Sequence, residues 1–149
     1  MAVRSLRRSE CGHCGRTCYE QGRVMSIEAA RRLDGGEPAE DYLRKLEKSP
    51  GHGQSNIRKL AAIAICFETF ANTGELARPR ELNDLEDDIL EIKGDAARLP
   101  FYLLTDNSHG QVARIVGGFD KREWRTPRKH IRDAIWVRGQ DVQWTRAGG

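Results

Sequence analysis

The chain has 149 residues, of which 38% are hydrophobic and 32% are charged, and its formal net charge at pH 7 is +3. This length suits one domain with a short appendage, and the composition predicts a soluble protein with a modest core. No apolar run approaches the roughly 18 residues that span a bilayer, and Met1–Arg8 lacks the apolar segment of a secretory signal. We therefore expect a cytoplasmic protein with no membrane partner.

The charges are unevenly distributed along the chain. Residues 1–33 carry seven basic and three acidic groups. Residues 34–113 carry nine basic and 15 acidic groups, and residues 114–149 carry nine basic and four acidic groups. Two basic ends thus flank an acidic middle. Such a distribution permits a local phosphate-binding face on a chain that is only weakly basic as a whole.

The first 36 residues are predicted to form an extension that precedes a domain of residues 37–149. Residues 1–25 contain little apolar sequence, and Ile27–Leu33 predicts a short helix that stops at the Gly35–Gly36 boundary.

Three cysteines in this extension have the spacing of metal ligands. Cys11, Cys14 and Cys18 are close enough in sequence to share a tetrahedral ion, which predicts a structural zinc site. The alternatives are free thiols in a flexible tail, a disulfide and an iron–sulfur site. A fourth zinc ligand would come from a partner or from one of three residues of this chain, namely His13, His52 and Cys66.

Two helices are predicted next. One begins at Pro38 and ends near Lys48, with acidic residues in its first turn and lysines in its last, as the helix dipole favours. The other extends from about Ser55 to Ala71. The sequence after it, up to Gly74, terminates the helix, and Gly74 is suited to a left-handed cap. The short connection predicts an antiparallel helical hairpin.

The hydrophobic period then changes from about 3.6 residues to about 2, which predicts strands. The expected strands are Leu90–Lys93, Leu99–Thr105 and Gln111–Val116, with a bulge or a one-sided edge at Pro100. Helices followed by antiparallel strands predict an α+β fold with a small twisted antiparallel β-sheet, an N-terminal helical hairpin and a short C-terminal helix.

The stretch Ala113–Ala134, ARIVGGFDKREWRTPRKHIRDA, organises the C-terminal part. It predicts a buried strand, a glycine pair, a basic turn and a helix that Thr126 and Pro127 begin and that closes near Arg138. A final short strand or tail is expected around Val142. A cation cluster beside a rigid helix start is well suited to hold phosphate.

This stretch also carries a family resemblance. The run from Gly118 to Ala134 resembles the gF-K-K…TP…I…A segment of the phage-derived, HigB-type branch of the RelE/ParE toxin superfamily. Leu85–Lys93 resembles the family's L-dg-lwElr strand, and Arg98–Tyr102 resembles its yR-vfY strand. The resemblance covers roughly residues 39–138 and leaves the cysteine segment outside.

The resemblance implies a RelE-like sheet and a toxin of a type II toxin–antitoxin system. Such a toxin cleaves mRNA on the ribosome without a metal or other catalytic cofactor, and a small helix-turn-helix antitoxin holds it inactive. By position, Arg98 matches the cation on the scissile phosphate, Lys93 a basic position on the preceding strand, and Arg122 or Lys121 the cation of the turn. His130 lies near the family's proton donor.

Two residues depart from the family pattern. Glu91 stands where some members carry a second lysine, and Pro100 could displace Tyr102, the tyrosine candidate for a proton-transfer role.

Cleavage of RNA without a metal needs cations at the phosphate and groups that move protons. The candidate catalytic residues are Arg98, Lys93, Arg122, His130 and Tyr102, and the candidate RNA-binding residues are Lys121, Arg125, Arg128, Lys129 and Trp124, the last by stacking on a base. The plain structural alternatives are an ion pair for Arg98, a core position for Tyr102 and a surface position for His130. The rival function is a non-catalytic protein that binds RNA or blocks a host target such as gyrase.

Overall fold

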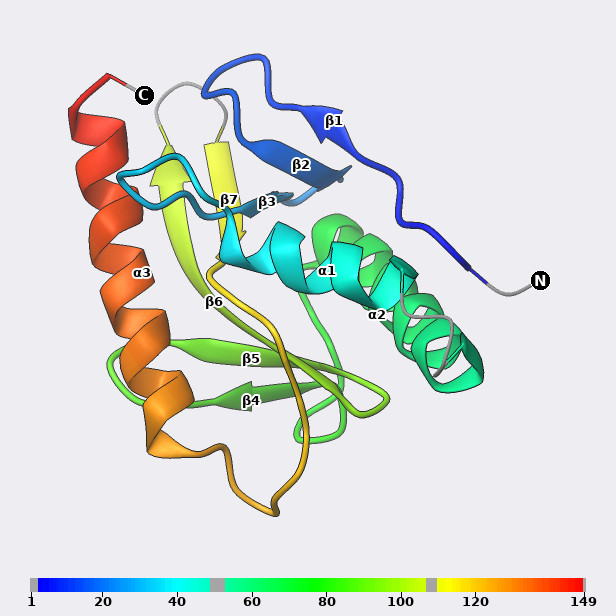
Figure 1. The fold of residues 1–149 in the computed structure, drawn as a ribbon. Helices are drawn as coiled ribbons and strands as arrows, with labels where there is room; N and C mark the ends of the chain where they lie inside the picture. Colours follow the sequence, from blue (N-terminus) through cyan, green and yellow to red (C-terminus); the bar gives the residue numbers. More distant parts are fainter. Residues whose placement is uncertain (1–2, 49–52, 107–109, 149) are drawn as a thin grey trace.

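The computed structural model of the chain describes residues 3–48, 53–106 and 110–148. Within these residues, three helices pack against a mixed sheet of eight strands, so the protein is an α+β fold (Figure 1). The elements in chain order are β1 (Ser9–Glu10), β2 (Thr17–Gln21), β3 (Ser26–Ala29), α1 (Pro38–Lys48), α2 (Gly53–Thr73), β4 (Leu82–Asp84), β5 (Leu90–Gly94), β6 (Ala97–Asp106), β7 (Gly110–Ile115), β8 (Phe119–Asp120) and α3 (Arg128–Arg146).

The strand order is β1-β2-β3-β7-β6-β5-β4, and β8 pairs with β6 beside this path. β3 runs parallel to β7, whereas the other pairs are antiparallel. The segment 1–36 thus supplies three strands to the same sheet as the rest of the chain.

The predicted small antiparallel sheet of RelE type, with an N-terminal helical hairpin and a short C-terminal helix, is wrong. The sheet is larger and mixed, three strands precede the helices, and the C-terminal helix has 19 residues. Val142 lies inside α3 rather than in a strand or tail.

The helix predicted at Ile27–Leu33 is also wrong, because its first residues form β3. Ile27 and Ala29 are fully buried there, and the strand pairs with β7 along its length. Burial and strand pairing outweigh the weak helical preference of the sequence IEAAR.

The two middle helices and the three middle strands are confirmed, with ends shifted by a few residues. α2 has the clearest stripe, because Leu60, Ile63, Phe67 and Phe70 recur at helical spacing and are all buried. α1 buries Ala39, Leu43 and Leu46 in the same way.

The helices cover opposite faces of the sheet (Figure 1). The larger core cluster joins α1 and α2 to one face, through residues such as Ile92, Leu99 and Phe101. A smaller cluster joins α3 to the other face, where Tyr102 meets Ala134 and Val137. Because side chains alternate along a strand, Glu91, Lys93 and Arg98 project to the face opposite the larger core.

Pro100 lies at the point along β6 where the strand that pairs with it on one side changes from β8 to β7. β8 pairs with β6 at Ala97 and Arg98, and β7 pairs with it from Phe101 onwards. The missing N–H of Pro100 falls in the gap between these two partners, so no ladder hydrogen bond is lost. Its carbonyl still accepts a hydrogen bond from Val116, at 2.9 Å.

Candidate nucleic-acid interface

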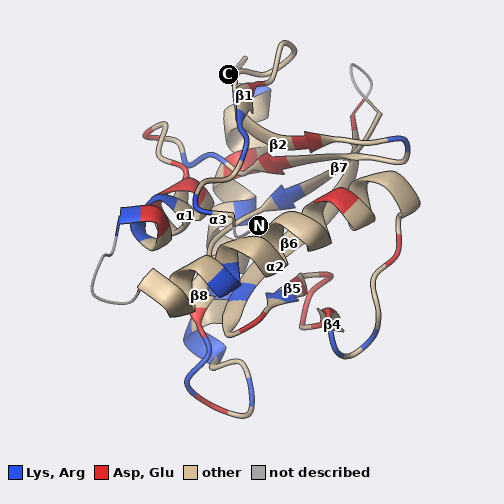
Figure 2. Cartoon of the chain, turned by 90° about the vertical axis from the view of Figure 1, so that its right-hand side faces the viewer, with Lys and Arg blue, Asp and Glu red and all other residues tan. Residues whose placement is uncertain are grey.

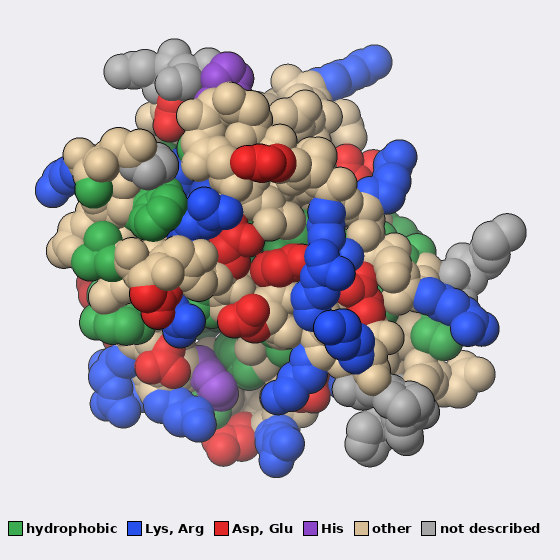
Figure 3. Space-filling model, turned by 45° about the horizontal axis from the view of Figure 1, so that its top comes forward, with side chains coloured by type: hydrophobic (Ala, Val, Ile, Leu, Met, Phe, Trp, Pro, Cys, Tyr) green, Lys and Arg blue, Asp and Glu red, His purple; other side chains and the backbone are tan. Residues whose placement is uncertain are grey.

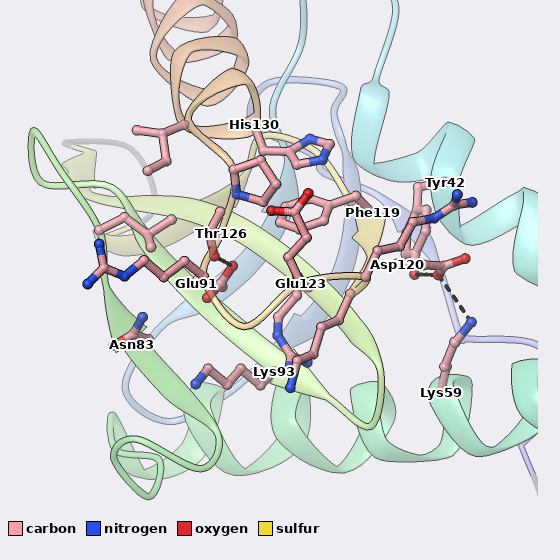
Figure 4. A pocket seen from close by; sticks show the side chains of 18 of the residues that line it. Tyr42, Lys59, Asn83, Glu91, Lys93, Phe119, Asp120, Glu123, Thr126 and His130 are labelled. Atoms are coloured by element: carbon pink, nitrogen blue, oxygen red, sulfur yellow. Dashed lines mark hydrogen bonds and ion pairs between the residues drawn. The ribbon is translucent and has the colours of Figure 1, made fainter.

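A cavity of about 1260 Å³ opens beside the end of the sheet that carries β8. Its walls come from α1, α2, β5, β6, the segment 118–127 and the start of α3 (Figure 4). Elements distant in the sequence therefore meet around one hollow.

Cations dominate the lining of this cavity. Eight lysines and arginines face three acidic residues there. In the segment after β8, basic and acidic residues follow one another closely along the backbone (Figure 2). The lining cations are Lys45, Lys59, Lys93, Arg98, Lys121, Arg122, Arg125 and Lys129.

Positive and negative side chains are interspersed on the face of the molecule seen in Figure 3. In the cavity lining, the cations outnumber the acidic residues by eight to three.

Arg98 and Lys93 are fixed by strand pairing. They are directly opposite each other in the β5–β6 ladder, and Arg98 also pairs with Phe119 of β8. The Arg98 guanidinium donates to the carbonyls of Asp95 and Ala97, at 2.8 and 2.9 Å. Burial lowers its pKa, against the opposing effect of the Glu91 charge, but the guanidinium stays a cation at any physiological pH.

Glu91 is the acidic residue at the centre of the cavity wall. Its side chain is almost fully buried, at 1% exposure, and it accepts a 2.7 Å hydrogen bond from the hydroxyl of Thr126 (Figure 4). Thr126 therefore ties the end of the basic segment to β5 instead of capping α3 with its side chain.

His130 stacks on Phe119 at the mouth of the cavity. The two ring centroids are 3.8 Å apart and the planes differ by 2°. Burial, followed by the charge of Lys129, lowers the pKa of His130 below its usual 6.5. The imidazole is accordingly neutral at pH 7 and can accept a proton.

Asp120 links the cavity to the helical layer. It accepts hydrogen bonds from the Tyr42 hydroxyl at 2.7 Å and from the Lys59 ammonium group at 3.1 Å (Figure 4). Burial raises the pKa of Asp120, but these two bonds outweigh it and lower the pKa overall. Asp120 thereby remains a carboxylate and offsets part of the positive charge.

Gly118 brings the basic segment close to α1. A Cβ at this position would lie 2.2 Å from an atom of the Tyr42 ring, whereas a Cβ at Gly117 would meet nothing within 4 Å. Only a glycine at 118 lets the backbone pass Tyr42 at this distance.

Most of the residues predicted from the sequence meet in this cavity. Eight of the ten candidates for catalysis or RNA contact line it, namely Lys93, Arg98, Lys121, Arg122, Trp124, Arg125, Lys129 and His130. Trp124 is 90% exposed, so its ring is available for stacking.

Tyr102 and Arg128 do not line it. Tyr102 is buried under α3, where its hydroxyl donates to Asp141, and burial raises its pKa. Arg128 lies on the exposed side of α3 and pairs with Glu86.

Sequence reasoning missed Tyr42, Lys59 and Asp120. Lys59 carried a usable signal, because it stands next to Leu60 on the buried face of α2. A lysine on an apolar helix face needs a carboxylate partner, although the sequence does not say which one.

The cysteine segment forms a separate group at the other end of the molecule. The Cys11 and Cys14 sulfurs and a carboxylate oxygen of Glu28 all lie within 4.8 Å of one another and can hold a metal ion. Cys18, the third predicted ligand, is not part of this group; its thiol donates to the Glu20 carbonyl, at 3.4 Å.

Of the proposed fourth ligands, Cys66 lies away from this group. Cys66 is buried in the main core, where its thiol contacts the Lys93 carbonyl at 3.8 Å, and burial raises its pKa to about 11. His52 lies outside the described residues.

Among the described residues, no helix is long and apolar enough to cross a membrane. The sequence matches no protein-family model and no curated protein. The resemblance to the HigB-type toxins therefore rests on the residues quoted for it.

Proposed function

We propose that the chain is an endoribonuclease toxin of a type II toxin–antitoxin system that binds and cuts mRNA in the cavity beside β8. The observation that carries the proposal is the convergence of Lys93, Arg98, Arg122 and Lys129 around a hollow that also holds the neutral imidazole of His130. Cations placed in advance stabilise the charge that develops on a phosphate during cleavage.

The reaction would be an internal transesterification. The ribose 2′-oxygen loses its proton to His130 and bonds to the adjacent phosphorus, and the bond from phosphorus to the 5′-oxygen breaks. Arg98, Lys93 and Arg122 hold the phosphate oxygens, and a lysine ammonium group, from Lys93 or Lys129, supplies the proton to the leaving 5′-oxygen. The products are a 2′,3′-cyclic phosphate and a 5′-hydroxyl end.

The motifs of residues 85–134 support the biological setting of the proposal. They resemble those of toxins that act on translated mRNA, so the substrate would be mRNA on the ribosome. The partner would be a helix-turn-helix antitoxin that covers the basic cavity.

For the cysteine group we propose zinc as the ion. Two thiolates and a carboxylate are ligands that Zn²⁺ accepts, whereas calcium and magnesium prefer oxygen ligands alone. The ion would fasten the turn of residues 11–16 and would have a structural role.

Replacement of Arg98 by alanine tests the main function. Arg98→Ala is expected to reduce mRNA cleavage in a translating extract by about 100- to 1000-fold, because one preorganised donor to the phosphate is lost. Growth inhibition on expression in bacteria is expected to fall with it.

Arg132→Ala is the matched control, because it removes the same charge from an exposed position of α3 outside the cavity. Full activity of Arg98→Ala, with its circular dichroism spectrum unchanged, would overturn the assignment. Tight binding of RNA by the wild-type chain without cleavage would favour the non-catalytic alternative.

A further inference from the structure

Backbone hydrogen bonds define the turn of residues 11–16. The Cys11 N–H donates to the Arg16 carbonyl and the Gly15 N–H donates to the Cys11 carbonyl, both at 2.8 Å. Gly15 has a φ of +75°, a left-handed conformation that suits glycine. These bonds place the sulfurs of Cys11 and Cys14, which are three residues apart in the sequence, on the same side of the turn.

The Cys11 sulfur is surrounded as a ligand would be. The backbone N–H groups of His13 and Cys14 donate to it, and it also contacts the Cys14 thiol and the Glu28 carboxylate. Burial, the largest effect, raises the pKa of the Cys11 thiol, and these two N–H groups oppose it only in part.

Glu28 enters this group from β3. It is fully buried, and one of its carboxylate oxygens lies 3.8 Å from the Cys14 sulfur. A tetrahedral zinc ion with Zn–S bonds of about 2.3 Å and a Zn–O bond of about 2.0 Å would place a sulfur and an oxygen about 3.5 Å apart. The present spacing therefore needs only a small contraction around an ion.

Arg114 balances the charge of such a site. Its guanidinium Nε donates to the same Glu28 oxygen at 3.2 Å, from the neighbouring position on β7. Two thiolates and one carboxylate exceed the charge of Zn²⁺ by one negative charge, which the buried Arg114 offsets. A ligand carboxylate held by such a partner is typical of metal sites.

We infer that the protein ligands of the zinc ion are Cys11, Cys14 and Glu28, and that Cys18 is not a ligand. This inference rests on the proposed binding of zinc. Zinc displaces the two thiol protons as the Zn–S bonds form. Water completes the tetrahedron, because the described residues offer three ligand groups at this spacing. The ion connects the turn to β3, and through β3 to the β7 side of the sheet.

Cobalt substitution of the full-length reduced protein tests the ligand set. The intensity of the sulfur-to-cobalt charge-transfer band counts the thiolates on the ion, and the wild-type chain is expected to show two. Cys18→Ser is expected to leave the band and the zinc content unchanged, whereas Cys14→Ser is expected to lose about half of the band. Glu28→Gln is expected to weaken zinc binding at least about tenfold, as measured against a chromogenic chelator.

The outcomes separate the two claims. A three-thiolate band in the wild type, with loss of zinc in Cys18→Ser, would overturn the ligand set and leave the zinc proposal standing. A wild-type chain with no bound zinc by native mass spectrometry, and no uptake of zinc or cobalt, would overturn both. If Glu28→Gln fails to fold, the wild-type band and Cys18→Ser still decide the question.

Discussion

At the scale of single residues, Glu91 changes the chemistry of the cavity most. A carboxylate among phosphate-binding cations would repel the substrate if it stood alone. Its hydrogen bond from Thr126 and its place near Arg98 give it a positioning role in the wall instead. The difference at this residue from the motif of the resembled toxins is therefore compatible with the proposed RNA binding.

His130 predicts the pH dependence of cleavage. Burial and Lys129 lower its pKa below 6.5, so the neutral base predominates above that pH and is lost as the pH falls through the lowered pKa. The value of kcat/KM is expected to rise with pH through an apparent pKa below 6.5 and then to level off. Rates on an RNA substrate measured between pH 4.5 and 8 check this.

Lys129→Gln provides the matched comparison for His130. Removal of the neighbouring positive charge is expected to move the acid limb of the profile to higher pH, even if the rate itself falls. Arg132→Ala is expected to leave the limb in place. An acid limb that does not respond to Lys129→Gln would exclude His130 as the base.

Residue types and motif order were enough to assemble most of the candidate site from the sequence. Lys93, Arg98, Arg122 and His130 were selected in this way, and all four line one cavity. Tyr102 shows the limit of this reasoning, because its orientation depends on a hydrogen bond to Asp141 on the buried face of α3, and that pairing spans 39 residues. A distant partner of this kind leaves no local pattern.

At the scale of elements, the segment 118–127 decides whether the cations reach the cavity. It starts at the close approach of Gly118 to Tyr42 and ends at the bond from Thr126 to Glu91. Between these two anchors, Lys121, Arg122 and Arg125 face the hollow. Their placement therefore depends on the backbone path more than on their own contacts.

Substitution of the glycine pair tests this dependence. Gly118→Ala is expected to displace the segment, because the added Cβ meets the Tyr42 ring at 2.2 Å, and RNA cleavage is expected to fall at least about tenfold with little loss of overall fold. The adjacent Gly117→Ala meets nothing within 4 Å and is the control. Equal activity of the two variants would show that the path past Tyr42 does not matter.

The elements divide clearly into those that local pattern predicts and those that it does not. α2 and β6 have long periodic apolar stretches, and both were predicted within a few residues. β3 has four residues and helix-forming composition, so its pairing with β2 on one side and with β7 on the other makes it a strand. α3 continues past Gly139 because Val137 and Asp141 are buried against the sheet.

At the scale of the whole molecule, a buried ionic junction joins the cysteine turn to the sheet and α3. The Asp141 carboxylate, fully buried, accepts hydrogen bonds from Arg16 at 2.8 Å and from Arg114 at 3.1 Å, as well as from Tyr102. Arg16 belongs to the turn that carries the cysteines, and α3 carries His130 at its other end. The two candidate sites are thus connected through one helix while each keeps its own chemistry.

The central claim is that the cavity cuts RNA by attack of the ribose 2′-oxygen. The most direct measurement is the chemistry of the ends formed when the wild-type chain is added to a translating extract. We predict cut mRNA with 2′,3′-cyclic phosphate and 5′-hydroxyl ends, absent when Arg98→Ala is added instead. Intact mRNA with the wild-type chain, or fragments with 3′-hydroxyl and 5′-phosphate ends, would contradict the claim.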